Sequence, residues 1–245
     1  MKSSKLDQVL LVVAISAAWQ LLYLAAGPNV ISSPADSLTR AAELLRTRSF
    51  WDNAANTGAA FGMASVLSIA GGTLVGLWLG LRQFAGDVAD PILGALYSLP
   101  KITLYPIILL IFGLGISAKV AFGAIHGFFP IAIFTMNAAR NVSPVYFRTA
   151  RIMRLSPVAT VATVLAPAAL PEIFAGIRIG LALTLLGTLI GELFASTSGL
   201  GFALIRATDI HAVPDITAIT FLIFVFAASV NALLHAIELQ VSHNV

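Results

Sequence analysis

The sequence predicts an all-α integral membrane protein with about six transmembrane helices. Of its 245 residues, 58% are apolar and only 10% are charged, whereas an ordinary soluble domain is roughly 45–50% apolar and about 25% charged. A helix needs about 20 apolar residues to cross a hydrocarbon core of about 30 Å, and the chain contains several such runs. We therefore expect a single transmembrane domain, residues 1–245, in a lipid bilayer.

The first span is expected at residues 9–26. Lys2 and Lys5 precede this run, and the Ala-Ala-Gly at 25–27 resembles the cleavage site of a secretory signal. The apolar part of a signal is about 7–15 residues long, whereas this run has 18 residues. Its length and the spans that follow favour an uncleaved first helix.

A polar stretch after the first span predicts a short amphipathic helix outside the bilayer core. Ser33 suits the N-cap position and Pro34 suits the first helical position. Apolar residues then recur at helical spacing between Arg40, Glu43 and Arg46. This pattern is typical of a helix that lies on a surface.

The remaining spans are expected at 54–81, 91–116, 120–139, 168–194 and 216–237. In the second of the six spans, small residues recur at every fourth position from Ala60 to Gly80. Such spacing allows helix backbones to approach closely in lipid, so we expect this face to serve packing.

The third span is expected to be irregular. Pro91, Pro100 and Pro106 interrupt it, and Lys101 stands between two apolar runs. Each proline removes a backbone donor and disturbs the preceding turn. Non-helical backbone at membrane depth survives only where protein or a water-filled cavity covers it. We therefore expect this segment to face the interior of the bundle.

The distribution of basic residues predicts the orientation. With the N-terminus inside, seven lysines and arginines lie on the cytoplasmic side and five lie outside. The dense cluster of four arginines from Arg140 to Arg154 favours the cytoplasm, where basic loops are enriched. An even number of spans then places both termini there. This bias also accounts for the net charge of +3, and no clustered basic face indicates nucleic-acid binding.

Two helix starts lie within the arginine-rich loop between the fourth and fifth spans. They are Ser143-Pro144 and Ser156-Pro157, and they predict short helices at 145–153 and 158–165. A solvated loop that only enforces topology would explain this segment. A surface that docks on another protein would explain it equally well, and the residues alone leave both readings open.

Several motifs follow this loop or precede it. Downstream are Ala166-Pro167-Ala168-Ala169-Leu170-Pro171, Gly176-Ile177-Arg178, Gly191-Glu192-Leu193-Phe194 and Ser198-Gly199-Leu200-Gly201; upstream are Leu99-Pro100 and Phe112-Gly113-Leu114-Gly115. Together they resemble the so-called EAA loop and neighbouring spans of binding-protein-dependent ABC importer permeases, in the nitrate, sulfonate and taurine branch. The resemblance covers about residues 33–238. It implies a type I permease-like bundle with a coupling loop at 143–166.

The chain departs from this family pattern at two places. Where the family has Glu-Ala-Ala, the chain has Arg148-Thr149-Ala150, and where the family then has glycine, the chain has Arg154. An arginine at the glycine position either adopts a less favourable backbone or reshapes the turn. The exchange at Arg148 predicts a changed docking surface, matched by an acidic groove on the partner.

The resemblance implies a division of labour between subunits. A homodimer of permease chains would form the pathway in the bacterial cytoplasmic (inner) membrane. An ATP-binding cassette ATPase dimer would bind ATP and Mg, and an extracytoplasmic substrate-binding protein would deliver the substrate. The chain has no Gly-x-x-x-x-Gly-Lys-Ser/Thr motif, so we expect no enzymatic activity and no cofactor in this chain. The residues expected to couple to the ATPase are Arg148, Ala150, Arg151, Arg154, Ser156, Pro167, Pro171 and Gly176.

Polar residues within the spans are candidates for the pathway, because such residues are costly in lipid. His126 and Asn137 share a face of the fourth span, and Thr184, Thr188 and Glu192 follow at spacing four on the fifth. Ordinary structural roles compete with this reading. The threonines would bond back to their own helix, Asn137 would bond to a neighbouring helix, and His126 would be a satisfied buried histidine without metal partners.

Glu192 has two interpretations of its own. It caps backbone donors in the loop around Gly199–Gly201, or it lines the outer gate. At the gate an unpaired carboxylate would repel an anionic substrate, so we expect it to pair with an arginine such as Arg206.

An ion-coupled secondary transporter is the main alternative function. Such proteins often show inverted repeats and intramembrane acids, and the two halves of this sequence do not match. A channel would need a ring of like side chains. A membrane enzyme would need a convergent set of acids, bases or metal ligands, and the chain has no cysteine and only four scattered histidines. The resemblance favours a sulfonate-, taurine- or nitrate-like anion as substrate, although related members carry cationic or aromatic vitamin precursors.

Overall fold

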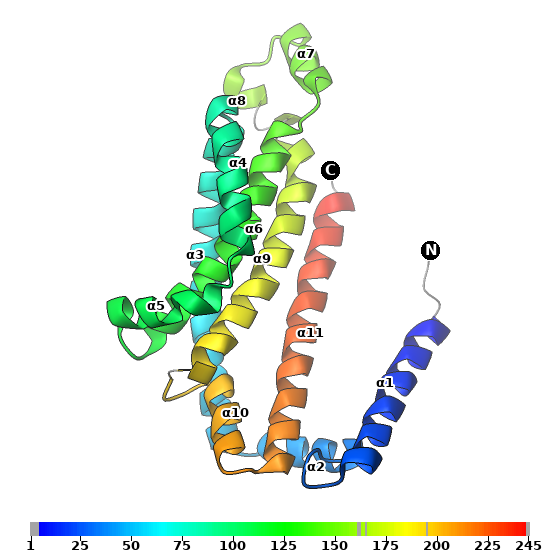
Figure 1. Ribbon diagram of the computed structural model, residues 1–245. Helices are drawn as coiled ribbons and strands as arrows, with labels where there is room; N and C mark the ends of the chain where they lie inside the picture. The colour runs from blue at the N-terminus through cyan, green and yellow to red at the C-terminus, as the bar shows by residue number, and fades with distance from the viewer. Residues whose placement is uncertain (1–4, 161–162, 165, 195, 244–245) are drawn as a thin grey trace.

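The computed structural model describes residues 5–160, 163–164, 166–194 and 196–243, and the regular structure in these ranges is helical. Figure 1 shows a bundle of long, roughly aligned helices with short helices at both ends. The elements are α1 (Lys5–Ala26), α2 (Pro34–Leu44), α3 (Arg48–Gly80), α4 (Gln83–Ser98), the 3₁₀ helix η1 (Lys101–Leu104), α5 (Tyr105–Phe112), α6 (Ile116–Arg140), α7 (Pro144–Ile152), α8 (Pro157–Thr160), α9 (Ala166–Phe194), α10 (Leu200–Asp209) and α11 (Val213–His243).

Within the described residues, five helices are long and apolar enough to cross a membrane. Their candidate spans are Val9–Ala26, Arg48–Gly80, Ile116–Arg140, Pro167–Phe194 and Val213–Ile237. These helices run in the regions expected at 9–26, 54–81, 120–139, 168–194 and 216–237. The largest difference is at α3, which begins at Arg48, because Thr47 caps it there by accepting the amide hydrogen of Phe50 at 3.3 Å.

The expected third span, 91–116, is not a single helix. Helix α4 and the segment Lys101–Phe112 together are apolar enough to span, but they are bent by 86° at the break. The break falls at Leu99, whose extended backbone (φ −62°, ψ 139°) is the conformation that a following proline favours. The expectation that Pro91 and Pro106 also interrupt the segment was wrong. Pro91 lies inside α4, and Pro106 lies in the first turn of α5, where no amide donor is required.

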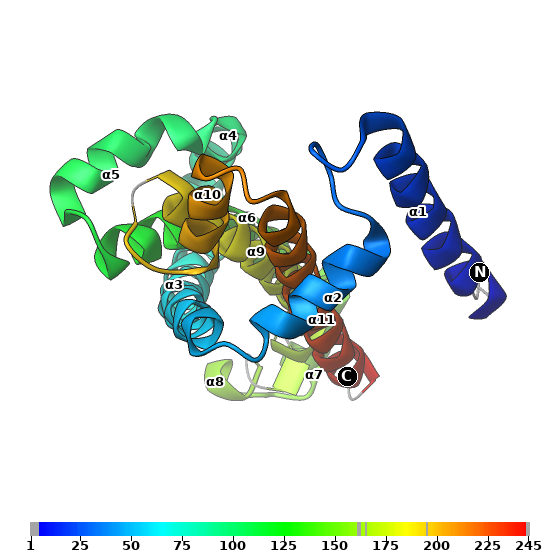
Figure 2. The ribbon, with the colours of Figure 1, turned by 90° about the horizontal axis from the view of Figure 1, so that it is seen from below.

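This bent segment faces the bundle along one side only. Leu93, Tyr105 and Ile108 are buried, whereas Ile107 and Leu110 are exposed. Figures 1 and 2 show α5 running outward from the end of α4 rather than along the bundle. The expectation that the segment faces the interior therefore holds for one side of it.

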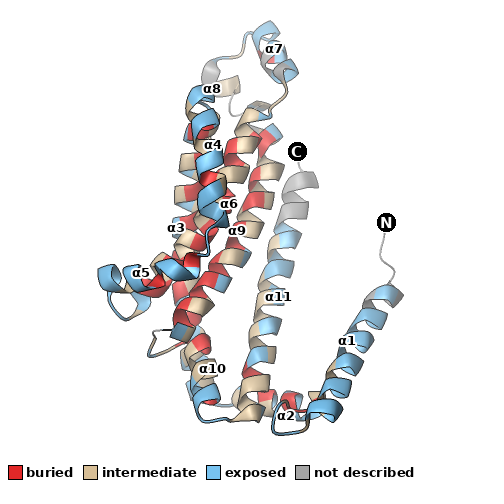
Figure 3. Ribbon diagram, viewed as in Figure 1, coloured by how far each residue is buried: buried red, intermediate tan, exposed pale blue. Residues whose placement is uncertain are grey.

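The core of the bundle lies where α3, α6 and α9 meet, as the band of buried residues in Figure 3 shows. The small residues of α3 face this contact, as expected. A Cβ atom added at Gly76 would lie 2.5 Å from the carbonyl oxygen of Ala132, and one added at Gly72 would lie 2.8 Å from Cβ of Ile131. Glycine therefore lets the backbones of α3 and α6 touch.

The two ends of the bundle carry different short helices. Helices α7 and α8 lie at one end, and α2 and α10 lie at the opposite end (Figure 1). The described start of α1 and the described end of α11 are directed toward the α7 end. Helix α1 stands apart from the other long helices (Figure 2), and none of its 18-residue apolar window is buried.

Helix α2 joins α1 to the bundle. Its N-cap is Ser33, which accepts the amide hydrogen of Asp36 at 3.1 Å, as the sequence predicts. Its buried side contacts α11. The guanidinium of Arg40 donates to Asp215 at 2.5 Å, and this hydrogen bond, with another to Glu43, raises the pKa of Arg40 above its ordinary value. The pair fixes α2 across the end of the bundle.

Candidate functional site

The expected coupling loop forms a pair of capped helices at one end of the molecule. Ser143 accepts the amide hydrogen of Val145 at 3.4 Å, and Ser156 accepts that of Ala159 at 3.2 Å. Both predicted helix starts are therefore confirmed. The second helix was expected to reach residue 165. It is described only to Thr160, and residues 161, 162 and 165 lie outside the described part of the chain.

Arg154 occupies the turn between the two short helices in a left-handed backbone conformation, with φ of +51°. The amide of Leu155 donates to the carbonyl of Ala150, and the amide of Arg154 donates to that of Arg151, each at 3.0 Å. These two bonds form a Schellman motif, whose left-handed position is usually glycine. The arginine thus keeps the turn and accepts a less favourable backbone, which is the first of the two expected outcomes.

The coupling candidates divide between two regions. Arg148, Arg151, Arg154 and Ser156 are exposed, whereas Ala150, in α7, is buried. Two apolar neighbours of the arginines are also exposed, and 83% of Ile152 is accessible, with Met153 beside it. No ion pair engages these three arginines within the described residues.

The other three coupling candidates lie at the start of α9. Pro167 is in its first turn, Pro171 lies inside the helix, and Gly176 packs directly against Phe134 of α6. These residues connect the coupling segment to the core of the bundle, because α9 continues from that end to Glu192. Their role in coupling stays a prediction.

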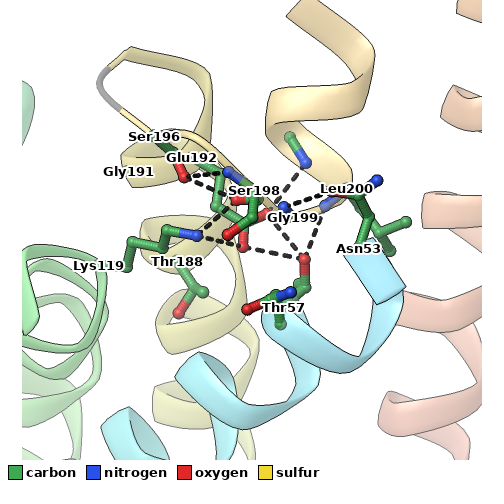
Figure 4. A network of polar contacts seen from close by, with 12 residues as sticks. Asn53, Thr57, Lys119, Thr188, Gly191, Glu192, Ser196, Ser198, Gly199 and Leu200 are labelled. Carbon is green, nitrogen blue, oxygen red and sulfur yellow. Dashed lines mark hydrogen bonds and ion pairs between the residues drawn. The ribbon is translucent and has the colours of Figure 1, made fainter. Parts of the chain in front are cut away.

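A buried polar cluster lies near the opposite end of the bundle, around Glu192 (Figure 4). The carboxylate is completely buried. It accepts hydrogen bonds from the hydroxyl of Thr57, 2.9 and 2.8 Å from its two oxygens, and from the amide of Gly201 at 3.0 Å. Lys119 forms an ion pair with it at 3.5 Å. One carboxylate therefore joins α3, α6, α9 and α10.

The same cluster satisfies the free amides at the start of α10. Asn53 accepts the amide hydrogen of Gly199 and Thr57 accepts that of Leu200, each at 2.8 Å, while Lys119 donates to the carbonyl of Ser198 at 2.5 Å. The first amides of a helix have no partner within the helix, and a negative charge there is favourable. We call Asn53, Thr57, Lys119, Glu192 and residues 198–201 the Glu192 cluster.

The capping interpretation of Glu192 is confirmed, and the expected pairing with Arg206 was wrong. Arg206 lies farther along α10 and is exposed, on the wall of a cavity of about 430 Å³. Lys119 takes its place because the first turn of α6 lies beside the last turns of α9. Lys119 was not among the site residues expected from the sequence, because it lies 73 positions from Glu192 and nothing local links the two.

The two threonines of α9 have the structural role that competed with a pathway role. Thr184 donates to the carbonyl of Gly180 and Thr188 to that of Thr184, each at 2.9 Å, and both are completely buried. They fill the space that Gly127 and Gly123 leave on α6. In this structure they lie in a helix contact rather than on an open surface.

The two pathway candidates on α6, His126 and Asn137, are not shown to line an open surface. His126 is buried and its Nδ1 lies 2.8 Å from the carbonyl oxygen of Phe122, which makes it the satisfied histidine that the sequence allowed. Asn137 is partly buried, and its side chain has no hydrogen bond to any described residue. A pathway role for either residue stays a prediction. Among the described residues, no three His, Asp or Glu side chains gather as metal ligands.

Lys101 is a candidate that sequence reasoning noted but did not select. It lies at the break between α4 and η1, and only 8% of it is exposed. Its ammonium donates to the carbonyl of Tyr97 at 2.8 Å and lies 5.0 and 5.5 Å from the ring centroids of Tyr97 and Phe129. The signal available in the sequence was a single charge within an irregular apolar segment.

Comparison with known proteins adds the family. Residues 72–243 match the family described as binding-protein-dependent transport system inner membrane component. A putative aliphatic sulfonates transport permease protein, SsuC of Bacillus subtilis, is 33% identical over 56% of this chain and 49% of its own length. The aligned part of the chain thus spans about half of that relative.

Other relatives share the same kind of description. The taurine transport system permease protein TauC of Escherichia coli is 29% identical over 70% of this chain and 64% of its own. The nitrate import permease protein NrtB of Synechococcus elongatus is 25% identical over 76% of this chain and 70% of its own. Permeases named for riboflavin and for formylaminopyrimidine also match.

A solved chain of the MetNI methionine ABC transporter, in inward-facing conformations, shows the same fold. The two chains superpose with a TM-score of 0.65 over 81% of this chain and 96% of that chain, at 21% sequence identity. The family match, the relatives and the membrane helices agree. The chain is a multi-pass membrane protein that belongs to the family of binding-protein-dependent transport system inner membrane components, the permeases of ABC importers.

Proposed function

We propose that this chain is the transmembrane subunit of an ATP-driven importer for a small anion of the sulfonate, taurine or nitrate kind. Two copies would form the translocation pathway, and separate ATPase subunits would bind and hydrolyse ATP with Mg²⁺. The observation that carries the proposal is the coupling segment, 143–160. It projects from one end of the bundle as two capped helices (Figure 1).

The surface of this segment suits a protein partner better than water. Arg148, Arg151 and Arg154 form no ion pair with any residue that the structure describes, and they lie beside exposed Ile152 and Met153. Arginine and methionine are enriched in protein interfaces, whereas a segment that only enforces topology does not need exposed apolar side chains. An ATPase with an acidic groove and an apolar floor would match this surface. The family resemblance at this loop supports the same partner.

Two described features suit the segment to transmit movement. The Schellman turn joins α7 to the following helix start, and α9 then leads from the segment to the Glu192 cluster at the other end. When the ATPase subunits close, the segment would move as a body and shift the balance between inward-open and outward-open forms. ATP binding to the partner subunits would thereby open and close the pathway, while this chain itself would catalyse no reaction.

The two ends of the bundle fit the sides of a bacterial cytoplasmic membrane. The arginine cluster lies at the α7 end, and the described ends of α1 and α11 are directed the same way. Both termini would then be cytoplasmic, because basic loops are retained inside. A substrate-binding protein would deliver its cargo at the opposite end, where α2 and α10 lie.

Affinity purification of the tagged chain from its native membranes tests the proposal. We expect an ATPase subunit to co-purify at about one copy per permease chain. Arg148→Glu should lower this recovery at least about tenfold, since it places an acid against the acidic groove. Arg48→Glu is the matched control, because Arg48 is exposed at the other end of the bundle.

Two results would contradict the proposal. If the chain purifies alone, even after crosslinking through residues 148–154, an ion-coupled secondary transporter becomes the leading function. If Arg148→Glu leaves the recovery of the ATPase unchanged, the ATPase remains the partner, but the proposed acidic groove on it is contradicted.

A further inference from the structure

Lys101 lies level with the middle of α6, a helix long and apolar enough to cross a membrane. Its ammonium is 5.5 Å from the ring of Phe129, and Phe129 lies near the midpoint of α6, which runs from Ile116 to Arg140. A charged side chain at this depth is costly and usually marks a functional site. Lys101 also follows directly on the non-helical backbone at Leu99 and Pro100, within the bent segment.

Within the described part of the chain, this ammonium has no carboxylate partner. Its hydrogen bond goes to the carbonyl of Tyr97, so two of its three donors remain available. No acidic side chain lies within ion-pair distance of it among the described residues. The other lysine of the bundle interior, Lys119, is neutralised by Glu192. The uncompensated charge in the middle of the bundle is therefore positive.

The positions of the acidic residues in the fold favour a partner other than a second copy of this chain. Asp87 and Asp90 lie in the first half of α4, and Asp87 is paired with Arg140 near the α7 end. Glu192 is fully enclosed by its own chain. The remaining acidic residues belong to α2 or to the end regions of other helices: Asp7, Asp36, Glu43, Asp52, Glu172, Asp209, Asp215 and Glu238. This placement favours a diffusible anion as the partner of Lys101.

The backbone around Lys101 is open toward the outside of this chain. Pro100, Ile102 and Thr103 are exposed beside the buried lysine. Irregular backbone at membrane depth is stable only when protein covers it or when it lines a water-filled cavity, and broken helices commonly line substrate sites in transporters. The lysine has a flexible stem of four carbons, so its ammonium can move toward such a cavity.

We propose that Lys101 is the cation that selects for anions in the translocation pathway. This inference rests on the proposed function, and it adds the residue that sets the charge of the substrate. The aromatic rings of Tyr97 and Phe129 hold the ammonium while no anion is present, since a cation over a ring face is stabilised. A passing sulfonate, carboxylate or nitrate group would take the two free donors.

A charge-selective labelling experiment tests whether the charge of Lys101 acts on ions in a water-filled pathway, and it does not require the substrate to be known. The chain has no cysteine, so Thr103→Cys introduces a single thiol next to Lys101. The thiol is treated, in membranes that contain the assembled complex, with anionic 2-sulfonatoethyl and cationic 2-(trimethylammonium)ethyl methanethiosulfonate. The measured quantity is the labelling rate with the anionic reagent divided by the labelling rate with the cationic reagent. We expect this ratio to fall about tenfold when Lys101→Met is added, because the substitution removes a unit positive charge within about 8 Å of the thiol.

Thr39→Cys is the matched control. Thr39 is exposed on α2, and its rate ratio should not respond to Lys101→Met. The proposal is overturned if Lys101→Met leaves the ratio at Thr103→Cys unchanged. It is also overturned if neither reagent reaches this thiol with or without ATP, because the segment would then not line a water-filled pathway.

Uptake of labelled methanesulfonate, taurine and nitrate by the reconstituted complex gives a second readout. Lys101→Met should lower uptake of the transported anion at least about tenfold with ATPase recovery unchanged, and Lys101→Arg should keep most of it. Wild-type uptake by Lys101→Met would overturn the inference. Loss of the ATPase partner in the wild type would contradict the proposed function instead, and the labelling ratio would still report on Lys101.

Discussion

The hydroxyl of Thr57 lies 2.8 Å from Oε2 of Glu192 and accepts the amide hydrogen of Leu200 at the same distance. One small side chain of α3 thus joins the buried end of α9 to the first turn of α10. All three partners are buried, so water cannot replace a lost hydrogen bond. The position should therefore be sensitive to loss of the hydroxyl and tolerant of loss of the methyl group.

Thr57→Val should destabilise the protein by about 1–3 kcal/mol, because it leaves a buried amide and a carboxylate oxygen without a partner. Thr57→Ser keeps the hydroxyl and should cost about 1 kcal/mol or less. Thermal unfolding in mild detergent, followed by intrinsic fluorescence, measures both. Equal effects of the two changes would show that the hydroxyl is not the stabilising group.

Lys119→Met should cost about 3–5 kcal/mol, because it leaves the Glu192 carboxylate unpaired in the interior. The double variant Lys119→Met with Glu192→Gln should recover a large part of this loss, since no uncompensated charge then remains. A double-mutant cycle on the thermal unfolding curves measures the coupling. Additive effects of the two substitutions would contradict a direct ion pair.

Gly76→Ala should destabilise the contact between α3 and α6. The new methyl group would lie 2.5 Å from the carbonyl oxygen of Ala132, and overpacking of this kind typically costs about 1–3 kcal/mol. Gly62→Ala lies in the same helix, where an added Cβ meets nothing within 4 Å. It should be neutral or stabilise by about 0.4–1 kcal/mol. If the two variants unfold at the same temperature, the helices are not in backbone contact.

Arg154→Gly should stabilise the turn of the coupling segment by about 1 kcal/mol, because glycine adopts a positive φ without the steric cost of a Cβ atom. Arg151→Gly is the control; it lies within α7 and should destabilise that helix by about 1 kcal/mol. Amide hydrogen exchange of Leu155, whose amide bonds to Ala150, reports on the turn. Faster exchange in Arg154→Gly would contradict the Schellman arrangement.

Asp215→Asn should loosen α2 from α11, because it removes the charge that holds Arg40. The pair is partly exposed, so the expected cost is only about 0.2–1 kcal/mol, and it should decrease with added salt. Since the pKa of Arg40 is raised on folding, its contribution is present at all pH values below the ordinary arginine pKa. Between about pH 6 and 9 the arginine should therefore cause no loss of stability. Disulfide crosslinking between cysteines at Ser37 and Thr217, which are hydrogen-bonded at 3.2 Å, measures the attachment.

Several local features could be predicted from the sequence because they depend on neighbours within a few residues. The N-caps at Ser33, Ser143 and Ser156 follow from a hydroxyl before a proline-started helix. The small-residue face of α3 follows from helical spacing alone. At Arg154 the arginine in place of a family glycine predicted either a strained or a reshaped turn, and the structure shows the strained one.

The break at Leu99 was predicted less well. Three prolines stood in that segment, and only Pro100 coincides with a bend. Pro91 sits inside α4 and Pro106 sits in the first turn of α5, so the outcome depended on where each proline falls relative to a helix start. That position is set by packing of the flanking helices, which periodicity does not report.

The sequence by itself determined that this protein is a bundle of membrane helices with a capped, arginine-rich segment at one end, because length, hydropathy and capping are properties of short stretches of chain. Only the tertiary structure decided that Glu192 pairs with Lys119, 73 positions away, and that Lys101 lies near two aromatic rings with no acidic partner among the described residues. Those partners depend on how each helix is rotated and where it crosses its neighbours. Small shifts in rotation exchange one partner for another, and only the packed bundle selects among them.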